Sequence, residues 1–186
     1  MEKARSWYKM GKIIFVLGGA RSGKSTYAVE FAKGIQKSVA FVATCLALDE
    51  EMKKRIELHI KKRPAGWETF EEPKDVSALL ERKGSQFDLI IIDCLTLLIS
   101  NLISDGLMDE DIEDKINKMI KVLKLNKCES IIVSNEVGLG IVPDNELARR
   151  FRDLAGKLNQ MIGAQADEVV FMVSGIPLKL KGGECE

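Results

Sequence analysis

A glycine-rich loop near the N-terminus is the feature of this sequence with the clearest chemistry. It matches the phosphate-binding pattern GxxxxGK[ST] and consists of Gly18, Gly19, Ala20, Arg21, Ser22, Gly23, Lys24 and Ser25. Glycine lets such a loop curl until its N–H groups point at phosphate oxygens, and the following helix N-terminus adds its positive dipole end. We expect Lys24 to reach the β and γ phosphates of a nucleotide and the Ser25 hydroxyl to ligate Mg²⁺. Because the loop follows the apolar run 12–17 and opens a helical pattern, a nucleotide site is favoured over a chance glycine-rich turn.

A carboxylate at the end of another apolar run is the next candidate. Asp93 closes the segment FDLIIID at 87–93. In P-loop enzymes an aspartate in this position holds the Mg²⁺ shell opposite the Ser or Thr ligand. Taken alone, Asp93 has a second interpretation, which is a cap for the helix that follows. Beside a complete phosphate-binding loop, the magnesium interpretation is favoured.

His59 is the only histidine of the chain, and it lies in the stretch DEEMKKRIELHIKKR. Met52, Ile56 and Ile60 recur every four residues, which predicts an amphipathic helix with His59 on or beside its apolar stripe. One interpretation is therefore a core histidine with a single satisfying hydrogen bond. The other is a nucleophile toward phosphorus, because a neutral imidazole can carry a covalent intermediate. Four cations close by could hold a polyphosphate: Arg55, Lys61, Lys62 and Arg63.

Apolar runs of strand length alternate with helical patterns along the chain. The expected strands are 12–17, 38–44, 87–93, 129–134, 167–174 and 176–181. The expected helices are about 24–36, 49–62, 73–83, 94–104, 109–125 and 144–165. Most of the strand runs are nearly continuous, which is typical of strands buried on both faces of a parallel sheet. The prediction is an α/β fold with a mainly parallel sheet covered by helices and 176–181 as an antiparallel edge strand.

Composition narrows the class of protein. The 186 residues carry 28 Lys and Arg against 28 Asp and Glu, so the basic excess of a non-specific nucleic-acid binder is missing and no nucleic-acid partner is expected. No apolar run reaches the ~18 residues of a membrane span, and the N-terminus lacks the apolar core of a secretory signal. The four cysteines show no close CxxC spacing. We therefore expect a cytoplasmic protein with reduced thiols and no transmembrane segment. One domain is expected at 12–181, between a loose extension at 1–11 and a tail at 182–186.

A set of motifs spread over the chain resembles one known family. The set is GGARSGKS, VATC, the stretch D-x-EM-x-x-RI-x-x-H-x-x-x-R with W-x-T-x-E-x-P after it, IDCLTLLISNL, SNEVGLGIVPDNELARRFRDLAGKLNQ and ADEVVFMVSGIPLKLK. From about residue 12 to residue 181 it resembles the bifunctional adenosylcobinamide kinase/adenosylcobinamide-phosphate guanylyltransferase family of cobalamin biosynthesis. The specificity lies in the set, because GGARSGKS alone identifies only an NTPase.

This resemblance implies two reactions on one chain. The first phosphorylates adenosylcobinamide with ATP or GTP, and the second transfers GMP from GTP to adenosylcobinamide phosphate with release of pyrophosphate. The resemblance implies a GMP–histidine intermediate, a RecA-like P-loop NTPase fold and a homotrimer. Adenosylcobinamide and its phosphate are then the expected small-molecule partners, and Mg²⁺ the expected cofactor.

The resemblance also implies site residues, carried over position by position. The histidine that receives GMP falls on His59. The nucleotide contacts fall on the loop at 18–25 and on Ala43, Thr44, Cys45, Ile60, Lys61, Lys62, Arg63, Glu71 and Asp93. Cys45 stands where serine is common, so we expect one hydroxyl contact to be missing there.

Two rival functions and one ambiguous segment remain open. A P-loop kinase for another small metabolite would share the loop and Asp93 but give His59 no role. A regulatory GTP switch usually carries a guanine-reading NKxD element, and none occurs in the sequence. After the run 129–134, Asp144 or Asn145 is expected to cap a helix, and the segment around them is equally suited to the corrinoid site or a subunit contact. Glu136 in that segment is a candidate to assist deprotonation of the acceptor hydroxyl.

Overall fold

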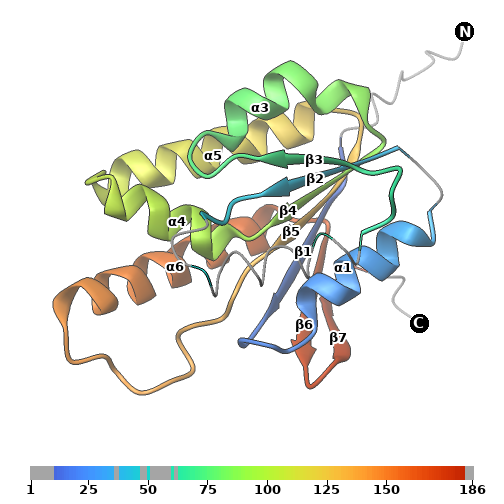
Figure 1. Ribbon diagram of the computed structural model, residues 1–186. Coiled ribbons are helices and arrows are strands. Elements are labelled where there is room, and N and C mark those ends of the chain that lie inside the picture. The colour runs from blue at the N-terminus through green and yellow to red at the C-terminus, as the bar shows by residue number, and fades with distance from the viewer. Residues whose placement is uncertain (1–10, 36–37, 47–49, 51–59, 61–62, 183–186) are drawn as a thin grey trace, which may run out of the picture.

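The structure is a computed structural model that describes residues 11–35, 38–46, 50, 60 and 63–182. A seven-stranded sheet runs through this part of the chain in the order β3-β2-β4-β5-β1-β6-β7 (Figure 1). The strands are β1 (Ile13–Gly18), β2 (Val39–Ala43), β3 (Glu68–Glu71), β4 (Leu89–Asp93), β5 (Glu129–Val133), β6 (Glu168–Val173) and β7 (Ile176–Lys181). Every neighbouring pair that the structure describes is parallel except β6 and β7, which are antiparallel. The predicted mainly parallel sheet with an antiparallel C-terminal edge strand is thus confirmed.

Continuous apolar sequence explains why the central strands are predictable. All of β2 is buried, and so are the first four residues of β4, because helices cover both faces of the sheet. Six of the expected strands agree with the structure to within two residues. β3 was not predicted, and its residues Glu-Thr-Phe-Glu are exposed at three of four positions. A short strand at the sheet edge needs no apolar run, so it gives no signal in the hydrophobic pattern.

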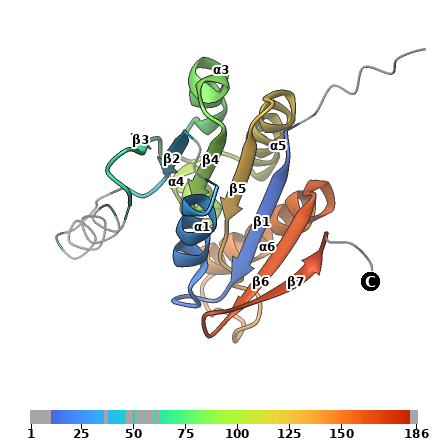
Figure 2. The same cartoon turned by 90° about the vertical axis from the view of Figure 1, so that its right-hand side faces the viewer.

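Helices form two layers, one on each face of the sheet (Figure 2). They are α1 (Lys24–Lys33), α3 (Val76–Lys83), α4 (Leu95–Ser104), α5 (Asp109–Leu125) and α6 (Glu146–Gln165), with a short 3-10 turn η1 (Gly84–Gln86). On one face, Ala28 and Ala32 of α1 pack against Val16 and its neighbours. On the other, residues of α3, α4, α5 and α6 form the larger core.

Local capping chemistry corrects several helix boundaries. The helices expected from 73 and 144 begin later, after Asp75 and Asn145, whose side chains accept hydrogen bonds from Ala78 N and Ala148 N. Asn145 rather than Asp144 is therefore the cap of α6. The first helix ends at Lys33 with Gly34 as its C-cap, short of the expected 36. Of the expected helix 49–62, the structure describes only Glu50 and Ile60, which are both helical.

The parallel register gathers several strand ends into one row. Glu71 of β3 pairs with Ala43 of β2, Ala43 pairs with Asp93 of β4, and Asp93 pairs with Val133 of β5. Gly18, at the end of β1, pairs with Met172 of β6. Open α/β sheets bind their ligands at the carboxyl ends of parallel strands, so a ligand site is expected at this edge.

The ends of the chain fall mostly outside the described residues. This applies to 1–10 of the expected N-terminal extension and to 183–186 of the expected tail. Gly11 is buried, and its N–H donates to Lys124 O at 3.0 Å.

Candidate nucleotide-binding site

The loop between β1 and α1 has the backbone of a phosphate cradle. Gly18 has φ 148°, Arg21 has φ 56° and Gly23 has φ 99°, and α1 begins directly after Gly23. A side chain on Gly18 would be impossible, because its Cβ would lie 2.5 Å from Met172 O. These dihedrals curl the chain at the N-terminus of a helix, and such a terminus readily binds an anion.

Lys24 is buried inside this loop. Its Nζ donates to Gly19 O at 2.6 Å and to Ser22 Oγ at 3.4 Å, and its exposed fraction is 7%. Desolvation lowers the pKa of Lys24, while the neighbouring Cys94 and Asp93 oppose that shift. In this structure the Lys24 ammonium donates to oxygens of its own loop. When a nucleotide binds, phosphate oxygens would replace these loop oxygens as its acceptors.

Asp93 stands at the centre of the row of strand ends. It is partly buried, and its carbonyl accepts from Thr44 N at 3.1 Å. The Asp93 carboxylate acts to raise the pKa of both Lys24 and Arg63, so it lies within electrostatic reach of two cations from different segments. Its alternative role as helix cap is not adopted, because Cys94 is the N-cap residue of α4 and that helix has no side-chain cap.

Arg63 brings a second cation to the same edge. Its guanidinium carbon lies 3.5 Å from the centroid of the Phe41 ring, and its Nη1 donates to Thr69 Oγ1 at 3.2 Å. Burial lowers the pKa of Arg63, against the opposing fields of Asp93 and Glu71. Stacking and one hydrogen bond fix the guanidinium plane and leave further N–H donors for a phosphate or a base. The predicted contacts Arg63, Glu71 and Asp93 are thus brought together.

Within the VATC motif, Thr44 makes contacts that its neighbours Ala43 and Cys45 do not make. It is fully buried; its Oγ1 donates to Cys94 O at 2.7 Å and accepts from Cys94 N at 2.8 Å. The hydroxyl therefore ties the end of β2 to the end of β4. Ala43 lies in the row itself, and the half-buried Cys45 thiol donates to Leu46 O at 3.6 Å. Burial raises the pKa of Cys94 to about 11, so its thiol stays protonated and is no nucleophile at neutral pH.

Asn101 also shapes the site, although it was not predicted from the sequence. From α4 its Nδ2 donates to Thr44 O at 2.8 Å and to Pro73 O at 3.0 Å. It thereby joins the segment after β2 to the segment after β3. Nothing in its local sequence distinguishes it from a polar residue on a helix surface, since both partners are distant in the chain.

The segment after β5 also approaches the loop. Glu136 N donates to Gly18 O at 2.9 Å, which anchors this segment to the end of β1. The Glu136 carboxylate accepts from Gly138 N at 2.8 Å within its own segment. Four large apolar side chains follow and are 60–96% exposed: Leu139, Ile141, Val142 and Leu147.

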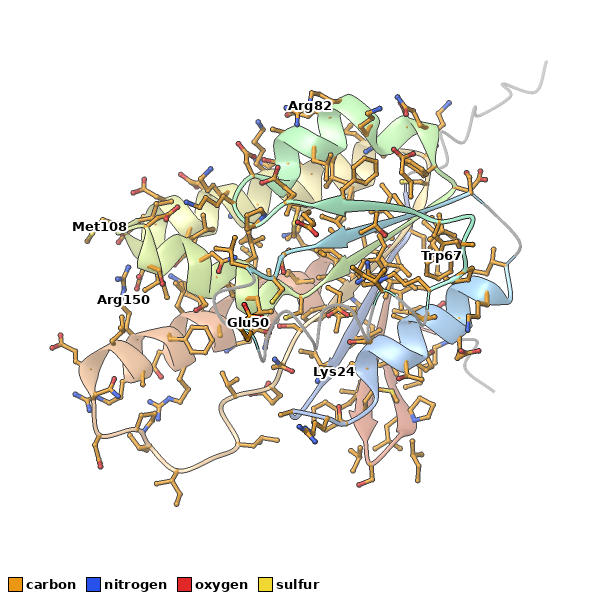
Figure 3. The ribbon with its side chains drawn as sticks, in the orientation of Figure 1. Lys24, Glu50, Trp67, Arg82, Met108 and Arg150 are labelled. Carbon is orange, nitrogen blue, oxygen red and sulfur yellow. The ribbon has the colours of Figure 1, made fainter. Side chains whose placement is uncertain are left out.

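The remaining predicted residues are only partly covered by the structure. His59, Lys61 and Lys62 lie outside the described residues, and Ile60 is exposed. Figure 3 shows Lys24 at the start of α1, where the loop after β1 ends. Ser25 lies half-buried in the first turn of α1, and Ala20 and Arg21 are exposed at the tip of the loop.

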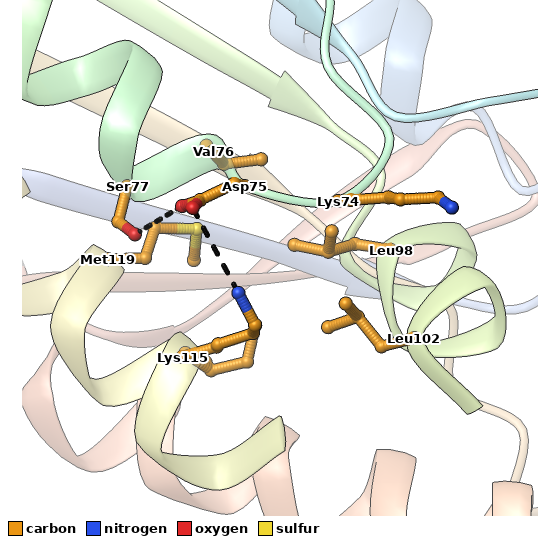
Figure 4. Close-up of a pocket in the computed structure, with 9 residues that line it drawn as sticks. Lys74, Asp75, Val76, Ser77, Leu98, Leu102, Lys115 and Met119 are labelled. Atoms are coloured by element: carbon orange, nitrogen blue, oxygen red, sulfur yellow. Dashed lines mark hydrogen bonds and ion pairs between the residues drawn. The ribbon is translucent and has the colours of Figure 1, made fainter. Parts of the chain in front are cut away.

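A small cavity elsewhere is no competitor for this site. It lies between α3, α4 and α5, where Asp75 bonds the Ser77 hydroxyl and faces Lys115 at 4.0 Å (Figure 4). Leu98, Leu102 and other members of the larger core line the rest of it. Asp75 and its partners serve the start of α3, so the cavity is a gap in helix packing.

Fold and loop together define a P-loop nucleotide-binding protein with a RecA-like sheet. The RecA protein of Borrelia hermsii is 26% identical over 189 residues, which cover 88% of this chain and 52% of that protein. The family model described as cobinamide kinase / cobinamide phosphate guanyltransferase matches residues 14–180. The chain belongs to this family.

Two relatives are similar over almost their whole length. The bifunctional adenosylcobalamin biosynthesis protein CobU of Salmonella typhimurium is 40% identical over 181 residues, which cover 91% of this chain and 99% of that protein. The bifunctional adenosylcobalamin biosynthesis protein CobP of Pseudomonas aeruginosa is 41% identical over 169 residues, which cover 90% and 96%. The family resemblance of the sequence motifs is confirmed. Within the described residues, no helix is long and apolar enough to cross a membrane.

Proposed function

We propose that this chain phosphorylates adenosylcobinamide with ATP or GTP and then transfers GMP from GTP to adenosylcobinamide phosphate. The observation that carries the proposal is the match to bifunctional relatives over nearly all of both chains. The curled loop with buried Lys24, beside Asp93 and Arg63, supplies the phosphate chemistry that both reactions need. A P-loop kinase for another metabolite would share the loop but not the family.

In the kinase step the acceptor hydroxyl attacks the γ phosphorus of the nucleotide. The bond from that phosphorus to the bridging oxygen breaks, the nucleoside diphosphate leaves, and the hydroxyl proton goes to a base. Lys24 stabilises the charge on the β and γ oxygens. Glu136 is a candidate base, because its carboxylate has a second oxygen besides the one that accepts from Gly138 N.

In the transfer step an imidazole nitrogen of His59 attacks the α phosphorus of GTP. Pyrophosphate leaves, and GMP remains on the nitrogen as a phosphoramidate. A phosphate oxygen of adenosylcobinamide phosphate then attacks the same phosphorus, which releases the imidazole and forms adenosylcobinamide-GDP. Arg63 offers guanidinium donors to the polyphosphate from its fixed plane on Phe41. For the remaining nucleotide contacts we propose the loop residues 18–25 together with Ala43, Thr44, Cys45, Ile60, Lys61, Lys62, Glu71 and Asp93.

A magnesium ion fits the donors present. Ser25 follows the buried lysine in the first turn of α1, and the Asp93 carboxylate lies within electrostatic reach of Lys24. A hydroxyl, a carboxylate and the nucleotide's phosphate oxygens are the hard oxygen ligands that Mg²⁺ prefers. When bound, the ion would neutralise charge on the β and γ phosphates.

We further propose a homotrimer in the cytoplasm, with residues 12–181 as one domain. The exposed apolar side chains after β5 support a subunit contact, because patches of this kind mark interaction surfaces. Among the described residues Cys45, Cys94 and Cys128 are thiols and not disulfides, which supports a reducing compartment. Sedimentation equilibrium of the full chain tests the trimer, and a concentration-independent monomer would contradict it.

Labelling with α-³²P GTP in the absence of acceptor tests the proposed function. The wild-type chain should acquire an acid-labile, alkali-stable label, and His59→Ala should acquire none while retaining kinase activity at least in part. Labelling should fall as the pH is lowered, because only the neutral imidazole attacks. Undiminished label on His59→Ala would exclude the histidine intermediate, and kinase activity without any label in the wild type would favour the simpler kinase.

A further inference from the structure

We propose that the turn between β6 and β7 positions the phosphate-binding loop for its ligand. The turn consists of Ser174 and Gly175, and the Gly175 N–H donates to Ser22 O at 3.0 Å. The inference rests on the proposed nucleotide site and adds to it a segment from the other end of the chain. Figure 1 shows the β6–β7 hairpin beside the loop that joins β1 to α1.

The hairpin itself fixes the geometry of this turn. Ser174 has φ 51° and Gly175 has φ 85°, and they are the two residues between Val173 and Ile176, which pair with each other. Positive φ at both central residues is the pattern of a type I′ turn, which matches the twist of two antiparallel strands. The direction of the Gly175 N–H is therefore set by the hairpin and not by the loop that it contacts.

This hydrogen bond orients one peptide group of the phosphate-binding loop. Ser22 O and the Gly23 N–H belong to the same trans peptide group, so they point in opposite directions. Because Ser22 O is held by the turn, the Gly23 N–H points away from the turn. In a loop of this pattern the N–H groups just before and within the start of the helix cradle the phosphates. Gly175 thus holds one of the donors in the direction that a ligand requires.

Close packing reinforces the same contact. A Cβ on Gly23 would lie 3.3 Å from Gly175 Cα and 3.6 Å from Met172 Cε, and one on Gly18 would lie 2.5 Å from Met172 O. The loop therefore rests directly on β6 and its turn. At its other end, Gly18 O accepts from Glu136 N at 2.9 Å. Two anchors hold the loop, and the turn is the one nearer to Lys24.

A glycine elsewhere in the chain allows a matched experiment. Gly106 follows α4 with φ 82°, and a Cβ on either Gly106 or Gly175 would meet nothing within 4 Å. Alanine disfavours a φ of about 80° at both positions and causes no clash at either. Alanine keeps the backbone N–H, but its strain at φ 85° should turn that N–H away from Ser22 O. Gly175→Ala should therefore weaken binding of GTP with Mg²⁺ about five- to tenfold by isothermal titration calorimetry, the loss expected for one hydrogen bond. Gly106→Ala should bind within about twofold of wild type, with a similar fall in Tm.

A conservative variant and a simpler ligand complete the test. Gly175→Asn also retains the backbone N–H but tolerates the left-handed region, so it should keep the N–H directed at Ser22 O and bind within about twofold of wild type. Inorganic tripolyphosphate should lose affinity for Gly175→Ala by the same factor as GTP, because the loop contacts only phosphate. If Gly175→Ala does not fold, Ser174→Val replaces it, since a β-branched residue disfavours φ 51° and leaves Gly175 in place.

The outcomes separate this inference from the nucleotide site on which it rests. Wild-type affinity in Gly175→Ala, with Tm lowered as in Gly106→Ala, would show that the turn only closes the hairpin, and the inference would be wrong. An equal loss of affinity in Gly106→Ala would also overturn it, because the effect would then be one of general stability. If the wild-type chain binds neither GTP nor tripolyphosphate, the nucleotide site itself is refuted.

Discussion

Replacing Thr44 by valine tests the way in which the structure joins two strand ends. The Thr44 hydroxyl is buried and makes two hydrogen bonds to the backbone of Cys94, one as donor at 2.7 Å and one as acceptor at 2.8 Å. Valine has nearly the same shape but offers neither. Cys94 O would still accept from Leu98 N at 3.2 Å, whereas the Cys94 N–H would lose the acceptor that the structure gives it.

The size of the effect follows from these partners. A buried N–H without an acceptor costs about 1–3 kcal/mol, and the bond donated to Cys94 O contributes about 1 kcal/mol, so Thr44→Val should lose roughly 2–4 kcal/mol of unfolding free energy. In a chain of this length that is a fall in Tm of roughly 5–15 °C. Thr44 N also donates to Asp93 O, so the loss of the two hydroxyl hydrogen bonds should displace Asp93 and raise the KM for GTP with Mg²⁺.

Urea unfolding followed by circular dichroism measures the change, with Thr44→Ser as the matched control. Serine keeps the hydroxyl and loses one methyl group, so it should cost only about 1 kcal/mol. If the unfolding free energy of Thr44→Val were within about 0.5 kcal/mol of wild type, the hydrogen bonds from Thr44 to Cys94 would add no stability, and the prediction would be wrong. A stable Thr44→Val variant that no longer binds GTP would instead show that the hydroxyl contacts the nucleotide, as the family resemblance implies.

Three further predictions concern single charged residues. Lys24→Ala should reduce kinase turnover by a factor on the order of 10²–10³, whereas Lys33→Ala, at the exposed end of α1, should match wild type; equal turnover in both would refute the role of Lys24. Asp93→Asn should raise the Mg²⁺ concentration needed for half-maximal rate in both reactions, and an unchanged magnesium titration would make Asp93 structural. Asp75→Ala should cost about 1 kcal/mol at pH 7, because Asp75 caps α3. Hydrogen bonds from Ser77 and from Ala78 N lower the pKa of the Asp75 carboxyl in the folded state. Its contribution to the free energy of unfolding is therefore complete above the ordinary carboxyl pKa and is lost as the pH falls through the lower folded pKa. A stability difference between variant and wild type that does not depend on pH would contradict this.

Patterns local in the chain account for most of the fold that the sequence predicted. The apolar runs of β1, β2, β4 and β5 identify buried parallel strands, because a strand covered on both faces has no polar side. β3 escaped prediction because an exposed edge strand is free of that requirement. The start of α3 was predicted three residues too early, since caps act through side-chain geometry that periodicity does not record, whereas Asn145 was one of the two caps expected for α6.

The sequence by itself determined the chemistry of the phosphate loop and the family. GxxxxGK[ST] is contiguous, and its glycines, lysine and serine act within a single turn of chain, so their spacing is visible without a structure. Only the tertiary structure decided which groups surround that loop. It directed the Thr44 hydroxyl to Cys94, placed Arg63 over Phe41 beside Asp93, and brought the Gly175 N–H to Ser22 O. Such contacts depend on strand order and register, which arise when the whole sheet packs between its helices. The residues involved have no fixed spacing in the sequence, so no motif predicts them.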